Sequence, residues 1–311
     1  MEQKRIVIAG GSGFIGTALA ASLAAQGYAV VILSRSPKGP PAGVREAAWD
    51  GKSPGPWVRE LEGAAAIINL AGRSINCAHT PENVREIIRS RVDSVRAIAA
   101  GMATLTTPPA AWVQASATGF YGDTGDQPSA ESAPSGKDLL ADICRQWEGG
   151  ITPEEIPQTR LVTLRIGFVL GQGGGAFPVL SGLTKYFLGG AAGDGRQYIS
   201  WIHRHDLIRI FSEAVVRSDW RGVYNATSPT PVTNADFMRT LREVMHRPWS
   251  PPAPAVAVRL GARLMGSEGS LALTSQRCPP VRLLASGFTY QFPELRPALA
   301  ELVAEQGHAP K

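Results

Sequence analysis

Near its start the chain reads Ile6-Val7-Ile8-Ala9-Gly10-Gly11-Ser12-Gly13-Phe14-Ile15-Gly16, a short apolar strand that runs into a glycine-rich turn. A helical pattern follows and ends at Gly27. Glycines allow a backbone to approach a pyrophosphate closely, and amides at the N-terminus of the next helix hold its charge. The residues that we expect at such a ligand are Gly10, Gly13, Phe14, Ile15 and Gly16. Because the motif opens a strand–helix–strand unit, a dinucleotide-binding loop is favoured over a tight turn without a ligand.

The end of the second predicted strand indicates which dinucleotide would bind. NAD-binding units usually place an acidic residue there to hold the ribose 2′-hydroxyl. Here the chain reads Leu33-Ser34-Arg35-Ser36, with Lys38 close behind and no acid before Glu46. A guanidinium and two hydroxyls suit a 2′-phosphate, so Ser34 and Arg35 predict NADP as the cofactor. The alternative is that Arg35 is a solvated loop charge.

Near-continuous apolar runs alternate with helical patterns through the first two-thirds of the chain. The predicted strands are Arg5–Ala9, Ala29–Leu33, Ala65–Leu70, Ala111–Ala115 and Leu161–Ile166. The clearest helix is Pro81–Met102, with Thr80 as its cap and one apolar stripe along it. Such runs are typical of strands buried on both faces of a parallel sheet. The pattern therefore predicts an α/β fold with a Rossmann-type doubly wound parallel sheet.

The final third has a different pattern. Prolines 248, 251, 252 and 254 form a stiff connection, and short helical patterns and one alternating strand, Phe288–Phe292, follow it. We expect a smaller C-terminal α/β substrate lobe there. The predicted boundaries are residues 1–170 for the dinucleotide-binding domain, to which the chain returns within about 198–230. Residues 171–197 and 231–311 form the predicted smaller lobe.

The composition is that of a folded chain. Its 311 residues are 44% hydrophobic, which excludes wholesale disorder and suggests about two domains. The net charge of +5 selects no partner, and no basic tract interleaved with aromatic residues supports nucleic-acid binding. No apolar run suits a membrane span, and the three widely spaced cysteines are typical of free thiols, so we expect a cytoplasmic protein. No metal is predicted, because His203 and His205 have no further ligand cluster beside them.

Further motifs extend over nearly the whole chain. They are Gly10–Gly16, Ser34-Arg35, Asn69–Gly72, Ser90-Arg91, Ser116–Gly122, Leu164–Gly167, Gly193–Gln197 and Ser200–His203. Together they resemble the extended short-chain dehydrogenases/reductases, and more narrowly an atypical epimerase-like subfamily of the NAD-dependent epimerase/dehydratase superfamily that has a small C-terminal domain of its own. The reading Ser275-Gln276-Arg277-Cys278 departs from that subfamily, in which a glycine and an aliphatic residue are more typical.

The resemblance implies further site residues. On the cofactor side these are Leu70, Ala71 and Gly72 after the Ala65–Leu70 strand, Glu86 and Arg91 on the following helix, and Val169 near the nicotinamide. Trp201 and His203 would line the substrate cleft, where the chain returns from the smaller lobe.

The catalytic pair of the parent group is missing. That group moves a proton through Tyr-x-x-x-Lys, but none of the six tyrosines here has a lysine four residues on. If Trp147-Glu148 sets the register of the expected helix, Leu140 and Cys144 occupy the two positions, and neither can transfer that proton.

Three hydroxyl residues at the carboxyl end of the Ala111–Ala115 strand are the candidate replacements. A phenol and two hydroxyls from Tyr121, Ser116 and Thr118 could bind a substrate carbonyl in the crevice where doubly wound sheets bind ligands. Ordinary packing of Tyr121 is an equal alternative.

Two functions therefore stay open. The first is an NADP(H)-binding, epimerase/oxidoreductase-like enzyme that acts on an unknown small carbonyl or nucleotide-sugar-like substrate. The second is a non-catalytic NADP(H)-binding sensor or regulatory protein, suggested by the missing tyrosine and lysine. The sequence leaves a homodimer open as well.

Overall fold

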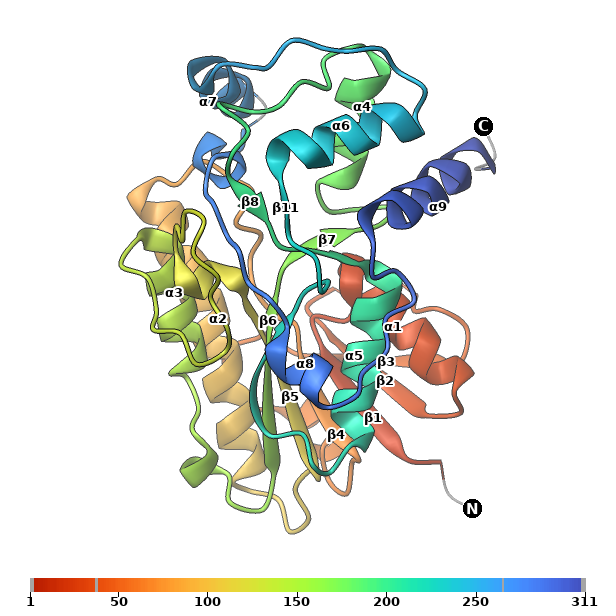
Figure 1. The fold of residues 1–311 in the computed structure, drawn as a ribbon. Coiled ribbons are helices and arrows are strands. Elements are labelled where there is room, and N and C mark those ends of the chain that lie inside the picture. The colour runs from red at the N-terminus through yellow and green to blue at the C-terminus, as the bar shows by residue number, and fades with distance from the viewer. Residues whose placement is uncertain (1–2, 37–38, 265, 309–311) are drawn as a thin grey trace.

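The computed structural model describes residues 3–36, 39–264 and 266–308. Figure 1 shows a large lobe built on one sheet, with a smaller and mainly helical lobe beyond the carboxyl ends of its strands. The sheet has seven parallel strands in the order β10-β6-β5-β4-β1-β2-β3. They are β1 (Arg5–Ala9), β2 (Ala29–Ser34), β3 (Val44–Ala48), β4 (Ala66–Asn69), β5 (Ala111–Ala117), β6 (Arg160–Ile166) and β10 (Gly222–Ala226). The predicted doubly wound sheet is confirmed.

Helices cover both faces of this sheet. Helices α1 (Phe14–Ala25) and α5 (Arg204–Val216) pack on one face, and α2 (Pro81–Met102) and α3 (Leu139–Glu148) pack on the other. Along β1, Ile6 and Ile8 belong to the first core, whereas Val7 and Ala9 belong to the second. All four side chains are fully buried. This is why the strands read as continuous apolar runs rather than as alternating ones.

Helix α2 begins and ends where the sequence predicts. The Thr80 hydroxyl accepts a hydrogen bond of 3.2 Å from the Asn83 amide, and Pro81 takes the first helical position. The five predicted strands are also present, with ends shifted by one or two residues at most. The sequence missed β3 and β10, because polar residues such as Glu46 and Asn225 interrupt their apolar pattern.

The smaller lobe combines helices with two short strand pairs. Its helices are α4 (Phe177–Lys185), α6 (Asn234–Val244), α7 (Ala255–Leu264) and α9 (Leu295–His308). Its strand pairs are β8 (Tyr198–Ile199) with β11 (Val232–Thr233), and β7 (Phe168–Leu170) with β9 (Trp201–His203). The 3-10 helices of the chain are η1 (Pro56–Glu60), η2 (Thr118–Tyr121), η3 (Pro153–Glu155) and η4 (Gly269–Ala272). A separate apolar core that includes Phe177, Phe237 and Leu299 holds this lobe together.

The C-terminal boundary differs from its prediction, because the chain after residue 280 returns to the large sheet. Helix α8 (Val281–Ala285) packs on β10, and Leu283 and Phe288 belong to the core of the sheet. The predicted strand Phe288–Phe292 is wrong as well. The backbone amides of Gln291 and Phe292 each donate a 2.8 Å hydrogen bond to the Asp206 carboxylate instead of pairing with a strand.

Within the described ranges, no helix combines the length and the apolar composition that a membrane span requires.

Because its carboxylate accepts the hydrogen bonds of two backbone amides, Asp206 should hold the C-terminal segment against α5. Its side chain is fully buried, and Asp206→Ala removes the acceptor of both amides, so we expect a loss of about 2–4 kcal/mol in the free energy of unfolding. Urea denaturation measures this loss. Asp219→Ala, which removes an exposed partner of Arg217, is the control and should leave the unfolding midpoint unchanged. Equal midpoints for Asp206→Ala and the wild type would contradict this role.

Candidate functional site

The strand order reverses between β1 and β4, and doubly wound sheets bind ligands outside the carboxyl ends of the strands at that point. The glycine turn lies there. Gly10 has a positive φ of 75°, and a Cβ on it would lie 2.8 Å from the carbonyl carbon of Leu70. A Cβ on Gly16 would lie 2.6 Å from the Cα of Gly11. Packing of the backbone against itself therefore requires both glycines.

Gly13 has a different environment. A Cβ built on Gly13 would meet only the Gly10 carbonyl oxygen, at an ordinary 3.5 Å, and Gly13 itself is exposed. Gly13 also caps α1 without a side-chain hydrogen bond, and the first turn of α1 holds no acidic residue. The first amides of α1 are thus free to bind an anion. The open space at Gly13 beside these amides fits a pyrophosphate.

The end of β2 supplies the predicted phosphate-binding side chains. Ser34 is buried, and its hydroxyl accepts a 3.2 Å hydrogen bond from the Ser36 amide. Arg35 follows it and is exposed. Lys38 lies outside the described residues. The structure thus places a hydroxyl and an exposed guanidinium at the strand end where NAD-binding units carry an acid.

The loop after β4 lies directly against the glycine turn, as the contact of Gly10 with Leu70 shows. The Ala71 amide donates a 3.0 Å hydrogen bond to Asn69 Oδ1, which fixes the backbone as it leaves the strand. Gly72 leaves the space that the Arg91 side chain occupies, since a Cβ there would lie 3.1 Å from two atoms of that side chain. The backbone of 70–72 is therefore in place beside the crevice.

Glu86 and Arg91 make contacts that support this loop. Arg91 Nη1 donates to the carbonyl oxygens of Arg73 (2.8 Å) and Ile87 (3.0 Å), and its guanidinium lies 4.7 Å from the centroid of the Trp147 ring. Burial lowers the pKa of Arg91 to about 10, which leaves it charged at neutral pH. The Glu86 carboxylate is bonded to the Arg73 guanidinium. Both side chains thus have partners around this loop, and their contact with the cofactor stays a prediction.

Val169 and Phe14 lie where the smaller lobe meets the glycine turn. Val169, on β7, is partly buried against the core of the sheet. The Phe14 ring packs against Gly171 and Gly174, where an added Cβ would come within 2.9 Å and 2.6 Å of it. The Arg204 guanidinium lies 5.3 Å from the centroid of the same ring. Phe14 therefore links the phosphate-binding loop to the entry of the smaller lobe.

The three hydroxyl candidates lie together at the end of β5, but each already has a partner for its proton. Ser116 Oγ donates to Glu148 Oε1 (2.6 Å), and Thr118 Oγ1 donates to Gln276 Oε1 (2.7 Å). Tyr121 Oη donates to Asn225 Oδ1 (2.7 Å). Each of the three residues is at most 4% exposed. A hydroxyl has one proton to donate, so none of them offers a free donor in this arrangement.

A buried ion pair holds this group of side chains. Arg165 makes two hydrogen bonds to Glu148, of 2.9 Å and 2.8 Å, and a third, of 2.9 Å, to the Tyr121 hydroxyl. Burial raises the pKa of Tyr121 to about 12, although the neighbouring Arg165 lowers it. Tyr121 is therefore a neutral packing and hydrogen-bonding residue, and the geometry disfavours the proton-donor role that the sequence suggested for it.

Trp201 and His203 are both buried. Trp201 is fully buried, and its indole donates to the Thr230 carbonyl oxygen (3.0 Å). His203 is 4% exposed, lies against Phe292 and is 3.2 Å from the Glu301 carboxylate. Burial lowers the pKa of His203 to about 4, so the ring is neutral at pH 7. This burial disfavours the substrate-cleft role, which stays a prediction, and His203 joins β9 to the C-terminal segment through Phe292 and Glu301.

Three residues of this site were missed by the sequence analysis. Arg165 and Glu148 come from β6 and α3, and Gln276 reaches Thr118 from 158 positions along the chain. The sequence signal for the ion pair was weak: Arg165 is a charge inside a mostly apolar strand, but α3 carries Asp142 and Arg145 as well as Glu148. The departure at Ser275–Cys278 drew attention to that turn, but nothing local connects it with β5.

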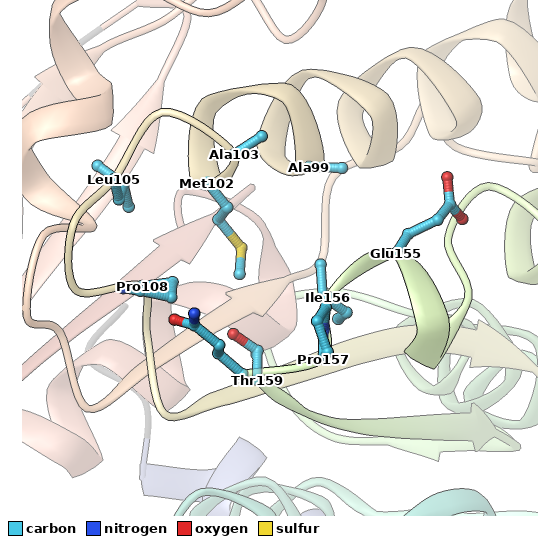
Figure 2. Close-up of a pocket in the computed structure, with 10 residues that line it drawn as sticks. Ala99, Met102, Ala103, Leu105, Pro108, Glu155, Ile156, Pro157 and Thr159 are labelled. Carbon is cyan, nitrogen blue, oxygen red and sulfur yellow. The ribbon is translucent and has the colours of Figure 1, made fainter.

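A hollow at the other end of the sheet is not part of this site. Figure 2 shows it between the C-terminal end of α2, with Met102, and the segment of Ile156 and Pro157 that leads into β6. It lies at the amino ends of β5 and β6, opposite to the edge at which doubly wound sheets bind ligands. In the parts of the chain that the structure describes, no three His, Cys, Asp or Glu side chains gather as metal ligands do.

Comparison with known proteins gives the same picture along the chain. The model of the NAD dependent epimerase/dehydratase family matches residues 6–141, and the model of a domain of unknown function matches residues 253–302. The epimerase family protein SDR39U1 of Bos taurus is 34% identical over 308 residues, which cover 96% of this chain and all of that protein.

Two solved structures extend this likeness to three dimensions. Human SDR39U1 (isoform 2), crystallised with NADPH, has a TM-score of 0.85 and 31% identity, and the match covers 96% of this chain and 99% of that one. A nucleoside-diphosphate sugar epimerase from Corynebacterium glutamicum has a TM-score of 0.78 and 32% identity, over 98% of this chain and 59% of that one.

The two kinds of glycine in the turn should respond differently to a methyl group. Gly16→Ala forces a Cβ to 2.6 Å from backbone, so we expect a clear drop in the temperature of unfolding. Gly13→Ala adds its methyl to open space and should unfold within about two degrees of the wild type. Differential scanning calorimetry of the two variants measures this contrast. A drop of equal size in both would show that Gly13 is also required by packing.

Proposed function

Because the chain belongs to the NAD dependent epimerase/dehydratase family, we propose that it binds NADP(H) and acts as an epimerase-like oxidoreductase on a small carbonyl or nucleotide-sugar-like substrate. One observation carries the cofactor proposal. An open glycine cradle at Gly13 stands beside a strand end that presents Ser34 and Arg35 instead of an acid. The NADPH in the crystals of the human relative supports the same choice.

The chain's own residues have distinct parts in this proposal. The amides of Phe14, Ile15 and Gly16 would hold the pyrophosphate, and Ser34 with Arg35 would hold the 2′-phosphate. The backbone of 70–72 and Val169 would border the rest of the dinucleotide. When bound, the nicotinamide supplies or accepts a hydride.

The substrate class rests on the likeness to the Corynebacterium nucleoside-diphosphate sugar epimerase and on the absence of a basic tract for nucleic acid. We place the protein in the cytoplasm, since its cysteines at 77, 144 and 278 are all free. A homodimer fits the proposal without being required by it.

The second candidate function, a non-catalytic NADP(H) sensor, is favoured by one observation: the hydroxyls of Ser116, Thr118 and Tyr121 all have partners. The register that Trp147-Glu148 would set agrees with it, since it puts Leu140 and Cys144 at the family's proton-transfer positions.

Turnover separates the enzyme from the sensor. The purified protein should bind about one NADPH per chain and should oxidise it steadily in the presence of at least one member of a panel of carbonyls and nucleotide sugars. Calorimetry and the loss of NADPH absorbance measure the two events. Stoichiometric binding without oxidation across the panel would favour the sensor, and failure to bind NADPH would overturn both.

Arg35 should select NADPH over NADH. Losing a charge-assisted contact with the 2′-phosphate costs about 1.5–3 kcal/mol, so Arg35→Ala should weaken NADPH binding by about 10- to 150-fold and leave NADH nearly unaffected. Isothermal titration with both cofactors measures this. Gly13→Val is the matched control, since a branched side chain in the cradle should weaken both cofactors alike. Equal losses of NADPH and NADH in Arg35→Ala would refute the assignment.

A further inference from the structure

Residues 272–278, which we call the strap, run between the two lobes. On the side of the smaller lobe, the Gln276 amide donates to the Tyr198 carbonyl oxygen (2.9 Å), and Ser200 Oγ donates to the Gln276 carbonyl oxygen (2.7 Å). On the side of the large lobe, the Thr124 amide donates to the Ser275 carbonyl oxygen (2.9 Å). Bonds of the main chain thus fix the strap, and they do not depend on the Gln276 side chain.

The Gln276 side chain points toward the end of β5. Its Oε1 accepts the hydrogen bond of Thr118 Oγ1. Its Nε2 lies 3.9 Å from the point that a Cβ on Gly119 would occupy, and this point is 3.3 Å from Leu140 Cβ and 3.6 Å from Cys144 Sγ. Among the residues that the structure describes, none accepts a hydrogen bond from Nε2, and Gln276 is partly exposed.

The start of α3 explains why this place matters. Leu140 and Cys144 lie one turn apart there. In the register that Trp147-Glu148 would set, they occupy the positions of the parent group's tyrosine and lysine. Leu140 has no polar atom, and Cys144 lies buried with its Sγ 3.7 Å from the Ala117 carbonyl oxygen. The amide of Gln276 therefore stands beside the place where the family's phenol has been lost.

Of the side chains gathered at the end of β5 in this way, Gln276 is the one whose donor, Nε2, has no acceptor among the described residues. The protons of Ser116, Thr118 and Tyr121 are each donated to a neighbouring side chain. The hydrogen bond from Thr118 also orients the Gln276 amide. Because Oε1 accepts this bond, Nε2 points away from Thr118.

We propose that Gln276 Nε2 donates a hydrogen bond to the oxygen of a substrate carbonyl, in place of the missing tyrosine, and that Thr118 is the positioning residue for this amide. The proposal rests on the proposed function, in which a carbonyl is reduced at this edge of the sheet. Gln276 polarises the carbonyl and itself gains and loses no proton.

The balance of the step is simple. The carbonyl carbon gains a hydride from NADPH, which is oxidised to NADP⁺. The electron pair of the C=O π bond moves to the oxygen, which takes up one proton from the solvent to form the new O–H bond. A preorganised donor of this kind typically contributes about 10²–10³-fold to kcat.

The first test needs no turnover. We would add para-nitrobenzaldehyde to the protein saturated with NADP⁺, which has no hydride to give, and follow side-chain amides labelled with ¹⁵N at glutamine by NMR. The Gln276 resonances, assigned by their loss in Gln276→Leu, should shift as the aldehyde binds. The exposed Gln146 on α3 is the internal control and should not shift. Binding without a shift at Gln276, or no binding of the aldehyde, overturns the proposal.

The second test compares variants during NADPH oxidation with the same aldehyde. Gln276→Leu should lower kcat by about 10²-fold and keep the NADPH affinity and the unfolding temperature of the wild type. Gln276→Glu keeps the acceptor for Thr118 but donates only when protonated, so its rate should recover as the pH falls toward the carboxyl pKa. Gln146→Leu should match the wild type.

The outcomes separate this inference from the function beneath it. Oxidation at the wild-type rate in Gln276→Leu overturns the carbonyl contact and leaves the enzyme standing. A Gln276 shift with the aldehyde but no NADPH oxidation by the wild type across the whole panel favours the sensor and leaves the carbonyl contact standing.

Discussion

Backbone meets backbone where the turn after β1 lies against the end of β4. At Gly10 a side chain would come within 2.8 Å of Leu70, and at Gly16 within 2.6 Å of Gly11. A methyl group at either place would have to move main chain, which is the least adaptable part of a fold. This contact directs the N-terminus of α1 into the crevice beside the reversal of the strand order, and the exposed Gly13 then leaves the helix amides open. The anion site is thus a consequence of packing around it.

The largely buried pair of Arg165 and Glu148 joins β6 to α3, the helix that carries Leu140 and Cys144. Burial by itself would lower the pKa of Arg165, but the hydrogen bonds and the charge of Glu148, together with the contact with Tyr121, outweigh burial and raise that pKa. Removing one partner of such a pair typically costs about 3–5 kcal/mol, because the other charge is left uncompensated. The pair also holds the hydroxyls of Ser116 and Tyr121. Polar groups that suggest chemistry in the sequence therefore act as structural groups in the fold.

Local sequence patterns were enough to predict the phosphate-binding loop and most of the strands of the sheet. Helix Pro81–Met102 could be placed because its cap, its proline and its apolar stripe all lie within one short segment. The strand predicted from the alternating run Phe288–Phe292 was wrong. An amide of this run donates to the carboxylate of Asp206, 85 positions away, instead of pairing with a strand. The same distance in sequence hid the approach of Gln276 to Thr118. Contacts of this kind arise from how the lobes pack, and no local spacing encodes them.

The two lobes share the contacts on which either function would depend. Phe14 joins the phosphate-binding loop to Gly171 and Gly174 at the entry of the smaller lobe, and the strap joins the same lobe to the end of β5 through Gln276. A hydrogen bond is lost beyond about 3.5 Å, so a shift of one lobe by an ångström would release the Gln276 amide from Thr118. In an enzyme, this coupling would align a carbonyl only when the cofactor loop is ordered. In a sensor, it would transmit a change in that loop to the surface of the smaller lobe. The enzyme and the sensor would therefore differ in one physical respect: only in the enzyme does a substrate carbonyl accept a hydrogen bond from Gln276 Nε2 when the dinucleotide is bound.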